Sequence, residues 1–206
     1  MNVKTVIKSV VIAASLAVAS VATQAQDFVF DYGSFTASSN RGAGDSPASF
    51  FSSVESDTVI GSISVLNDLN SDGEIRFAIF DHPTETLLFS TGPIFFADNG
   101  MSWKTSNTFS FTLLAGHQYD IGAVANVGGR WAYTTGANVT QNGLTMTSRN
   151  ANFSGFDAIT SGNHAAALIP IQITTAVPEP ETYAMLLAGL GLMGAISRRR
   201  KTKLAE

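Results

Sequence analysis

Hydrophobic and polar residues alternate along the middle of the chain with the period of a β-strand. In "EIRFAIF", Ile75, Phe77 and Ile79 alternate with Arg76 and Ala78, and the segments "TFSFTLL" and "QYDIGAVA" repeat the pattern. A strand with one face on a core has this two-residue period, whereas an amphipathic helix repeats every 3.6 residues. We therefore predict a β-strand at each of the three segments.

Turn-forming clusters separate these segments from further strand candidates. The clusters are "SNRGAGDSP", "NSDG", "LLAGHQ" and "NVGG", and no segment offers a long amphipathic helix. About nine short strands in one domain of this length predict an all-β fold, an antiparallel β-sandwich of jelly-roll type. The remaining predicted strands span 28–36, 59–66, 87–90, 129–133, 144–148 and 168–174.

The N-terminus has the three parts of a secretory signal peptide. Lys4 and Lys8 precede an apolar run over 10–22, and small residues follow at Thr23 and Ala25. A permanent anchor is disfavoured, because the run is short for a membrane span and ends at a cleavage pattern. We predict a signal peptide over 1–25, export through the Sec machinery, and a β-sandwich domain over 26–176.

The C-terminus carries a Pro-Glu-Pro motif over 177–181, an apolar run over 182–197 and an Arg/Lys cluster over 198–201. As a helix the run would reach about 24 Å against a hydrocarbon core of about 30 Å, so it is a marginal single transmembrane helix. Basic residues directly after it place the tail on the cytoplasmic side. A buried core helix is disfavoured, because this run is apolar all round and ends in charge.

This tail resembles the PEP-CTERM sorting signal of exported Gram-negative bacterial proteins, which is also labelled the C-terminal domain of ice-binding proteins. The resemblance implies a transient anchor in the inner membrane and cleavage near the motif by an exosortase. It further implies release of the body to the cell surface or to an extracellular polysaccharide matrix, as in a biofilm. The residues that carry the resemblance are Pro178, Glu179, Pro180, Arg198, Arg199 and Arg200.

Charge and cysteine content exclude several partners and chemistries. Between residues 26 and 176 there are five basic and thirteen acidic residues, a net charge of −8. Such a body should be repelled by nucleic acid and by anionic membrane surfaces. The chain has no cysteine, which excludes disulfides, zinc thiolates and a thiol nucleophile.

No sequence motif for catalysis or a cofactor is present. We find no G-x-S-x-G or H-E-x-x-H, and His82, His117 and His164 are isolated from one another in the sequence. The G-x-G-x-x-G spacing of "GLGLMG" lies within the apolar tail with no preceding strand, so it does not predict a dinucleotide site. We predict a protein that is not an enzyme and has no organic cofactor.

Two functions remain open. The first is a non-catalytic surface or matrix protein, and the second is a carbohydrate-binding module that stacks sugar rings on Trp103, Trp131 and Tyr133. The "GRWAY" segment places Trp131 and Tyr133 on one face of a strand, which is either core or binding platform. Burial of both rings would favour the first function, and exposure of both would favour the second.

One segment has the opening half of a calcium loop. In "NDLNSDGEIRF", Asp68, Asn70 and Asp72 occupy alternate positions before Gly73, but position twelve is Ile79 where an EF-hand requires Glu. The helix-loop-helix form is therefore excluded. Two interpretations stay open: a polar hairpin turn, or a weak structural Ca²⁺ site with ligands Asp68, Asn70, Asp72 and Glu74.

Overall fold

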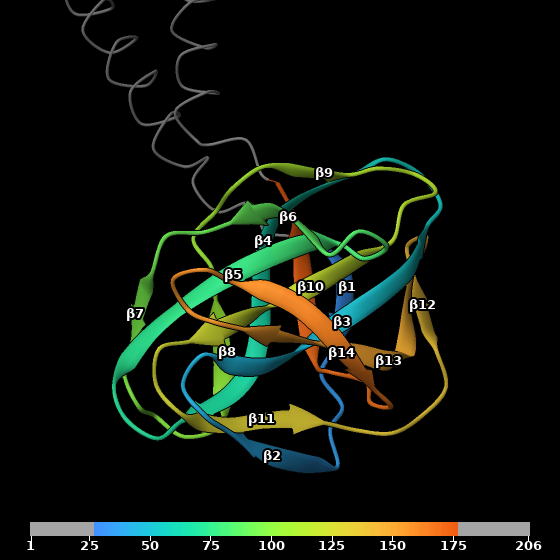
Figure 1. Cartoon of the computed structure of the whole chain (residues 1–206). Coiled ribbons are helices and arrows are strands. Elements are labelled where there is room, and N and C mark those ends of the chain that lie inside the picture. The colour runs from blue at the N-terminus through green and yellow to red at the C-terminus, as the bar shows by residue number, and fades with distance from the viewer. Residues whose placement is uncertain (1–26, 177–206) are drawn as a thin grey trace, which may run out of the picture. The chain divides into compact units, whose positions relative to one another are not determined.

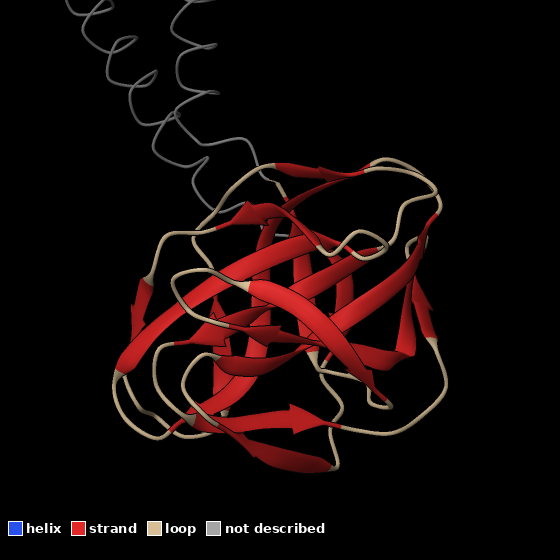
Figure 2. Ribbon diagram, viewed as in Figure 1, coloured by secondary structure: helices blue, strands red, loops and turns tan. Residues whose placement is uncertain are grey.

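The computed structural model describes residues 27–176, apart from the side chains of Asn163 and His164. Within this range every regular element is a strand, and every strand pair is antiparallel (Figure 2). The predicted all-β antiparallel body is therefore confirmed. The predicted signal peptide and C-terminal helix lie outside these residues, and inside them no helix is long and apolar enough to cross a membrane.

The strands form two sheets (Figure 1). The first sheet has the order β1 (Phe28–Tyr32), β15 (Ile171–Thr175), β4 (Thr58–Leu69), β11 (Gly129–Tyr133), β2 (Ala37–Arg41), with β8 (Ser102–Thr105) and β9 (Phe111–Leu113) also on β4. The second has the order β12 (Val139–Gln141), β13 (Leu144–Ser154), β3 (Asp45–Val54), β10 (Tyr119–Ala125), β5 (Gly73–Asp81), β6 (Thr86–Ser90), with β14 (Thr160–Ala165) on β13 and β7 (Ile94–Phe96) on β5.

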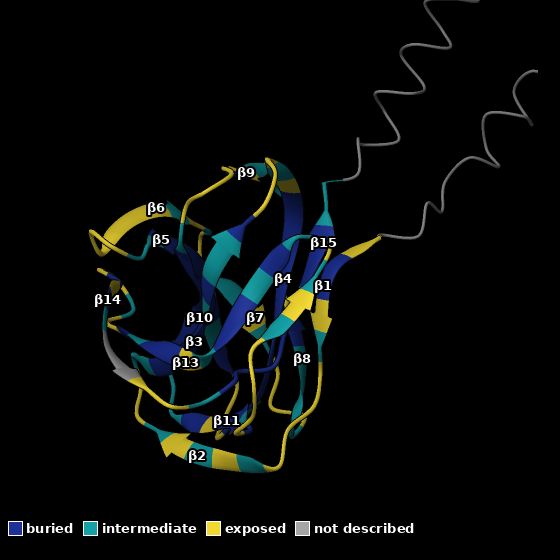
Figure 3. Cartoon of the chain, turned by 90° about the vertical axis from the view of Figure 1, so that its right-hand side faces the viewer, coloured by how far each residue is buried: buried dark blue, intermediate teal, exposed yellow. Residues whose placement is uncertain are grey.

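The main core lies between the two sheets, as in a β-sandwich. Phe30 of β1 meets Phe51 of β3 edge to face, with ring centroids 5.0 Å apart. Figure 3 shows the central strands β4 and β10 largely buried and the edge strand β6 largely exposed, whereas β2 alternates between half-buried and exposed residues. The alternation in β2 has the two-residue period of a strand, in which successive side chains point to opposite faces of the sheet.

The second sheet is buried on both faces, which the sequence pattern did not predict. Ile75, Phe77 and Ile79 of β5 face the main core as expected, but Ala78 and Phe80 on the opposite face are also buried. They belong to a second hydrophobic cluster, against which Phe156 packs. Burial on both faces explains why the alternation in β5 is incomplete.

Three predicted turn regions have a different role in the structure. "SNRGAGDSP" was predicted as a turn, but β2 ends at Arg41 and β3 begins at Asp45, so only 42–44 turns. "NSDG", for which a polar hairpin turn was one of two interpretations, and the predicted turn "LLAGHQ" do not close hairpins. Both instead join strands of different sheets, β4 to β5 and β9 to β10. Among the described strands, only three pairs that are consecutive in the chain also pair with each other in a sheet: β5–β6, β12–β13 and β13–β14. The jelly-roll order of the strands stays a prediction.

The two ends of the described domain lie together. Strands β1 and β15 are paired, and Thr175 N donates to Asp27 O at 2.9 Å. Ala176 packs closely against Gly61, because a Cβ atom added to Gly61 would lie 2.5 Å from the Cα atom of Ala176. Residues 26–176 form one compact unit, so the fold extends to the residue before the Pro-Glu-Pro segment.

Candidate functional site

The three aromatic residues predicted as a sugar platform do not gather in one place. Trp131 is 1% exposed and belongs to the main core, so it offers no ring face to a ligand. Trp103 is half-buried on β8, which is a different strand, and its ring lies against Gly33. Tyr133 lines a pocket in which neither tryptophan takes part.

That pocket has a volume of about 250 Å³ and lies where β2 and β11 of the first sheet meet β3 and β13 of the second. In register, Trp131 pairs with Ser39, Gly129 with Arg41 and Tyr133 with Ala37. Ser39, Arg41 and Tyr133 all line the pocket. Its other walls come from Pro47, Asn150, Ala165, Ala166, Ala167 and Ile169.

The polar groups of the pocket are only partly satisfied. The Arg41 guanidinium lies 3.4 Å from Asp45 Oδ2 through Nη1 and 3.4 Å from Ser39 Oγ through Nε. Asn150 is buried, and its Nδ2 donates to Ala151 O at 3.0 Å. Its Oδ1 has no hydrogen-bond partner among the described residues. The pocket thus combines a long ion pair with one buried acceptor that is unused.

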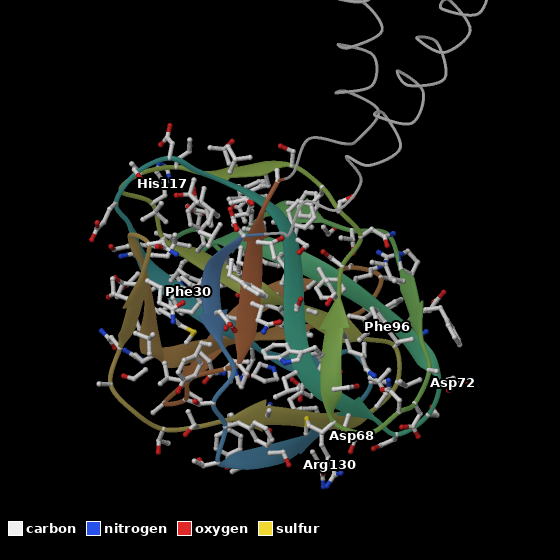
Figure 4. All side chains as sticks on the ribbon, turned by 180° about the vertical axis from the view of Figure 1, so that it is seen from behind. Phe30, Asp68, Asp72, Phe96, His117 and Arg130 are labelled. Carbon is white, nitrogen blue, oxygen red and sulfur yellow. The ribbon has the colours of Figure 1, made fainter. Side chains whose placement is uncertain are left out.

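The residues of the predicted calcium loop each have another partner. Arg130 forms an ion pair with Asp68, and Figure 4 shows these two residues side by side. Asp72 Oδ1 accepts from Asp98 N at 2.8 Å, and Glu74 Oε2 accepts from Asn126 Nδ2 at 3.2 Å.

The fourth proposed calcium ligand, Asn70, is exposed, and its backbone N donates to Gly128 O at 2.9 Å. Residues 27–176, as far as their side chains are described, contain no cluster of three acidic or histidine side chains suited to a metal. Whether calcium binds here stays a prediction.

A buried carboxylate joins two residues that the sequence left isolated. Asp120 is fully buried, with Oδ1 at 2.8 Å from His82 Nδ1 and Oδ2 accepting from Ser161 Oγ at 2.8 Å. Phe50 stacks on the imidazole at a centroid distance of 3.7 Å. His117 is exposed in the β9–β10 connection, and the side chain of His164 lies outside the described part.

A buried lysine is a second feature that the sequence did not indicate. Lys104 is 2% exposed, and its Nζ donates to Asn99 Oδ1, to Ser102 Oγ and to Ala97 O. Burial lowers the pKa of Lys104, and the charges of Asp98 and Asp68 partly oppose this shift. Its place opposite Val65 in the β4–β8 pair explains the burial, because Val65 faces the core.

Comparison with known proteins identifies one segment of the chain. Residues 176–201 match the model of the PEP-CTERM protein-sorting motif. Among curated proteins no match to the chain is found. The predicted sorting motif is therefore confirmed, whereas the family of the central domain is not recognised. The motif implies an exported protein that an exosortase processes.

Proposed function

We propose that the chain is a non-catalytic protein of the cell surface or of an extracellular polysaccharide matrix. The observation that carries the proposal is the sorting motif, which begins directly after the last strand of the compact β domain. In the proposed route, Sec exports the chain, the tail holds it briefly in the inner membrane, and exosortase cleavage releases the body.

Two properties of the body support a structural or adhesive role: the first concerns its partners, and the second concerns catalysis. Its net charge of −8 disfavours nucleic acid and anionic membranes as partners. In the His82, Asp120 and Ser161 group, the aspartate lies between the other two and bonds to each. Nucleophilic catalysis needs the histidine to contact the hydroxyl directly, with the aspartate behind it. The group therefore suits the support of β14 on its sheet.

Mass spectrometry of the protein from its native host tests this route. We expect cleavage after Ala25 and near Pro178 to Pro180, and recovery of the mature form in the surface or matrix fraction. Deleting the exosortase should leave the uncut form in the inner membrane. Peptides from 184–198 in the released protein would contradict the proposal. Neutral residues at Arg198, Arg199 and Arg200 should misplace the tail, because the positive-inside bias is lost.

A further inference from the structure

The pocket beside β2 contains a buried acceptor that the fold does not use. Asn150 is 1% exposed, and its carbonyl oxygen has no partner among the described residues. A buried polar atom without a hydrogen bond is destabilising, and native proteins leave few of them. Asn150 lines the pocket, and a ligand that donates a hydrogen bond would satisfy this oxygen once the Asn150 side chain turns it toward the cavity.

Hydrogen-bond donors are available on the opposite wall of the pocket. The two contacts of Arg41, at 3.4 Å to Ser39 and to Asp45, are longer than the usual range. A guanidinium carries five N–H donors in a planar fork, so several remain for a ligand oxygen. Asp45 already balances the charge of Arg41, and an anionic ligand would also meet a body of net charge −8. A neutral ligand with hydroxyl groups fits both walls, because each hydroxyl donates and accepts.

The rest of the pocket is apolar. The ring of Tyr133 shares the lining with Pro47 and Ile169, and small alanine side chains complete it. Ligand sites usually combine such surfaces with a few polar groups that fix the orientation. A pyranose matches this arrangement, since it has an apolar C–H face and hydroxyl groups around its rim.

We propose that this pocket binds one neutral sugar residue at the end or branch of an extracellular glycan. Asn150 accepts from one hydroxyl, Arg41 donates to another, and Tyr133 packs against the C–H face. The site deepens the proposed matrix role and rests on it for the source of the glycan. It differs from an exposed aromatic platform, because neither tryptophan takes part.

Saturation-transfer NMR on the released protein from its host tests the site. The probes are the methyl glycosides of glucose, galactose, mannose and N-acetylglucosamine, with glucuronate as the anionic comparison. We expect at least one neutral glycoside to bind and glucuronate to bind more weakly. Arg41→Lys and Tyr133→Ala should each weaken binding at least tenfold. Arg149→Lys, on the exposed side of β13, is the matched control and should leave binding unchanged.

Three results would overturn the proposal. They are no binding by any neutral glycoside, tighter binding of glucuronate than of the neutral sugars, or unchanged binding in Arg41→Lys and Tyr133→Ala. Circular dichroism and melting curves show that each variant is folded, and Tyr133→Phe, which keeps the ring, should retain most of the binding. A protein that reaches the matrix but binds no glycoside would reject the pocket alone and leave the proposed delivery intact.

Discussion

The two edge strands of the first sheet, β1 and β2, use side-chain amides in opposite ways. At β1, Gln141 Oε1 accepts from Asp31 N at 2.7 Å, and Gln141 Nε2 donates to Asp31 O at 2.9 Å. Beside β2, Asn150 of β13 lines a pocket, and its side-chain carbonyl oxygen has no partner in the described range. The same chemical group closes one edge and stays available at the other. Whether a side-chain amide has hydrogen-bond partners therefore distinguishes a structural contact from a candidate binding site.

A tight hairpin explains how the β1 edge is closed. Asn142 and Gly143 between β12 and β13 have φ values of 47° and 78°, the positive values that a two-residue type I′ turn requires. The turn places Gln141 beside Asp31, and Asn142 Nδ2 donates to Val29 O at 2.9 Å. Side chains thus cover backbone groups that an unprotected edge strand would offer to another chain.

The largest expected effect comes from breaking the core beneath the closed edge. Phe30→Ala removes a fully buried ring that packs on Phe51 across the two sheets. We expect the free energy of unfolding to fall by about 3–5 kcal/mol, because lost burial and a cavity both contribute. Urea denaturation measures the change.

Phe28→Ala is the matched control for Phe30→Ala. Phe28 lies on the same strand but is 48% exposed, so its replacement should change the free energy of unfolding by less than about 1 kcal/mol. Equal losses in the two variants would contradict the structure, in which Phe30 is buried in the core and Phe28 is exposed.

The second prediction concerns the closed edge itself. Gln141→Leu removes both hydrogen bonds to Asp31, and we expect a loss of about 1–2 kcal/mol, because water can partly replace them at this exposed position. Hydrogen exchange at the Asp31 amide should become faster. Asn107→Leu, an exposed asparagine outside the strands, should leave that amide unchanged. An unaltered exchange rate in Gln141→Leu would mean that the amide does not close the edge.

The third prediction makes the same kind of change, amide to leucine, at the pocket, where we expect no comparable loss of stability. Asn150→Leu replaces a buried amide by an apolar side chain and removes its unpartnered oxygen. We expect the free energy of unfolding to stay within about 1 kcal/mol of the parent or to rise, since the unsatisfied acceptor is gone. Glycoside binding should be lost. A loss of stability as large as that of Gln141→Leu would remove the contrast between the two edges.

The sequence predicted the strands at the centre of the sheets and β11 beside the pocket, but it did not predict β2, β3 or β14. β3 was missed because its first residues, Asp45 to Pro47, were interpreted as part of a turn cluster, and a proline normally argues against a central strand. In the structure, β10 pairs with β3 only from Ser49 to Phe51, and the Ser46 hydroxyl donates to Ala123 O beyond them. A side chain thus replaces a backbone donor at the end of the ladder, which no pattern of hydrophobic residues reveals.

The closed edge and the pocket also differ in how far the sequence could predict them. The Asn142-Gly143 pair is a strong sequence signal for a hairpin, and it could have located the closed edge. The pocket could not be found from sequence, because Arg41 and Asn150 come from strands of different sheets. Likewise, the burial of Trp131 and the exposure of Arg130 depend on which face of β11 meets the core.

The last prediction tests the role of hydrogen-bond partners at the β4–β5 connection, where we expect added Ca²⁺ to have no effect. There the carboxylates have partners: Arg130 for Asp68 and the Asp98 backbone for Asp72. By analogy with the closed edge, we expect these groups to fix the connection rather than to bind a ligand. Asp72→Ala should lower the free energy of unfolding by about 0.5–1.5 kcal/mol, the worth of one hydrogen bond.

The melting temperature of the parent should be the same in millimolar Ca²⁺ and in chelator. A weak extracellular calcium site, with a Kd on the order of 10⁻⁴ to 10⁻³ M, would instead raise the melting temperature with Ca²⁺, and Asp72→Ala would abolish the rise. That result would show that carboxylates with protein partners can exchange those partners for an ion. The presence of partners would then exclude ligand binding only at neutral amides.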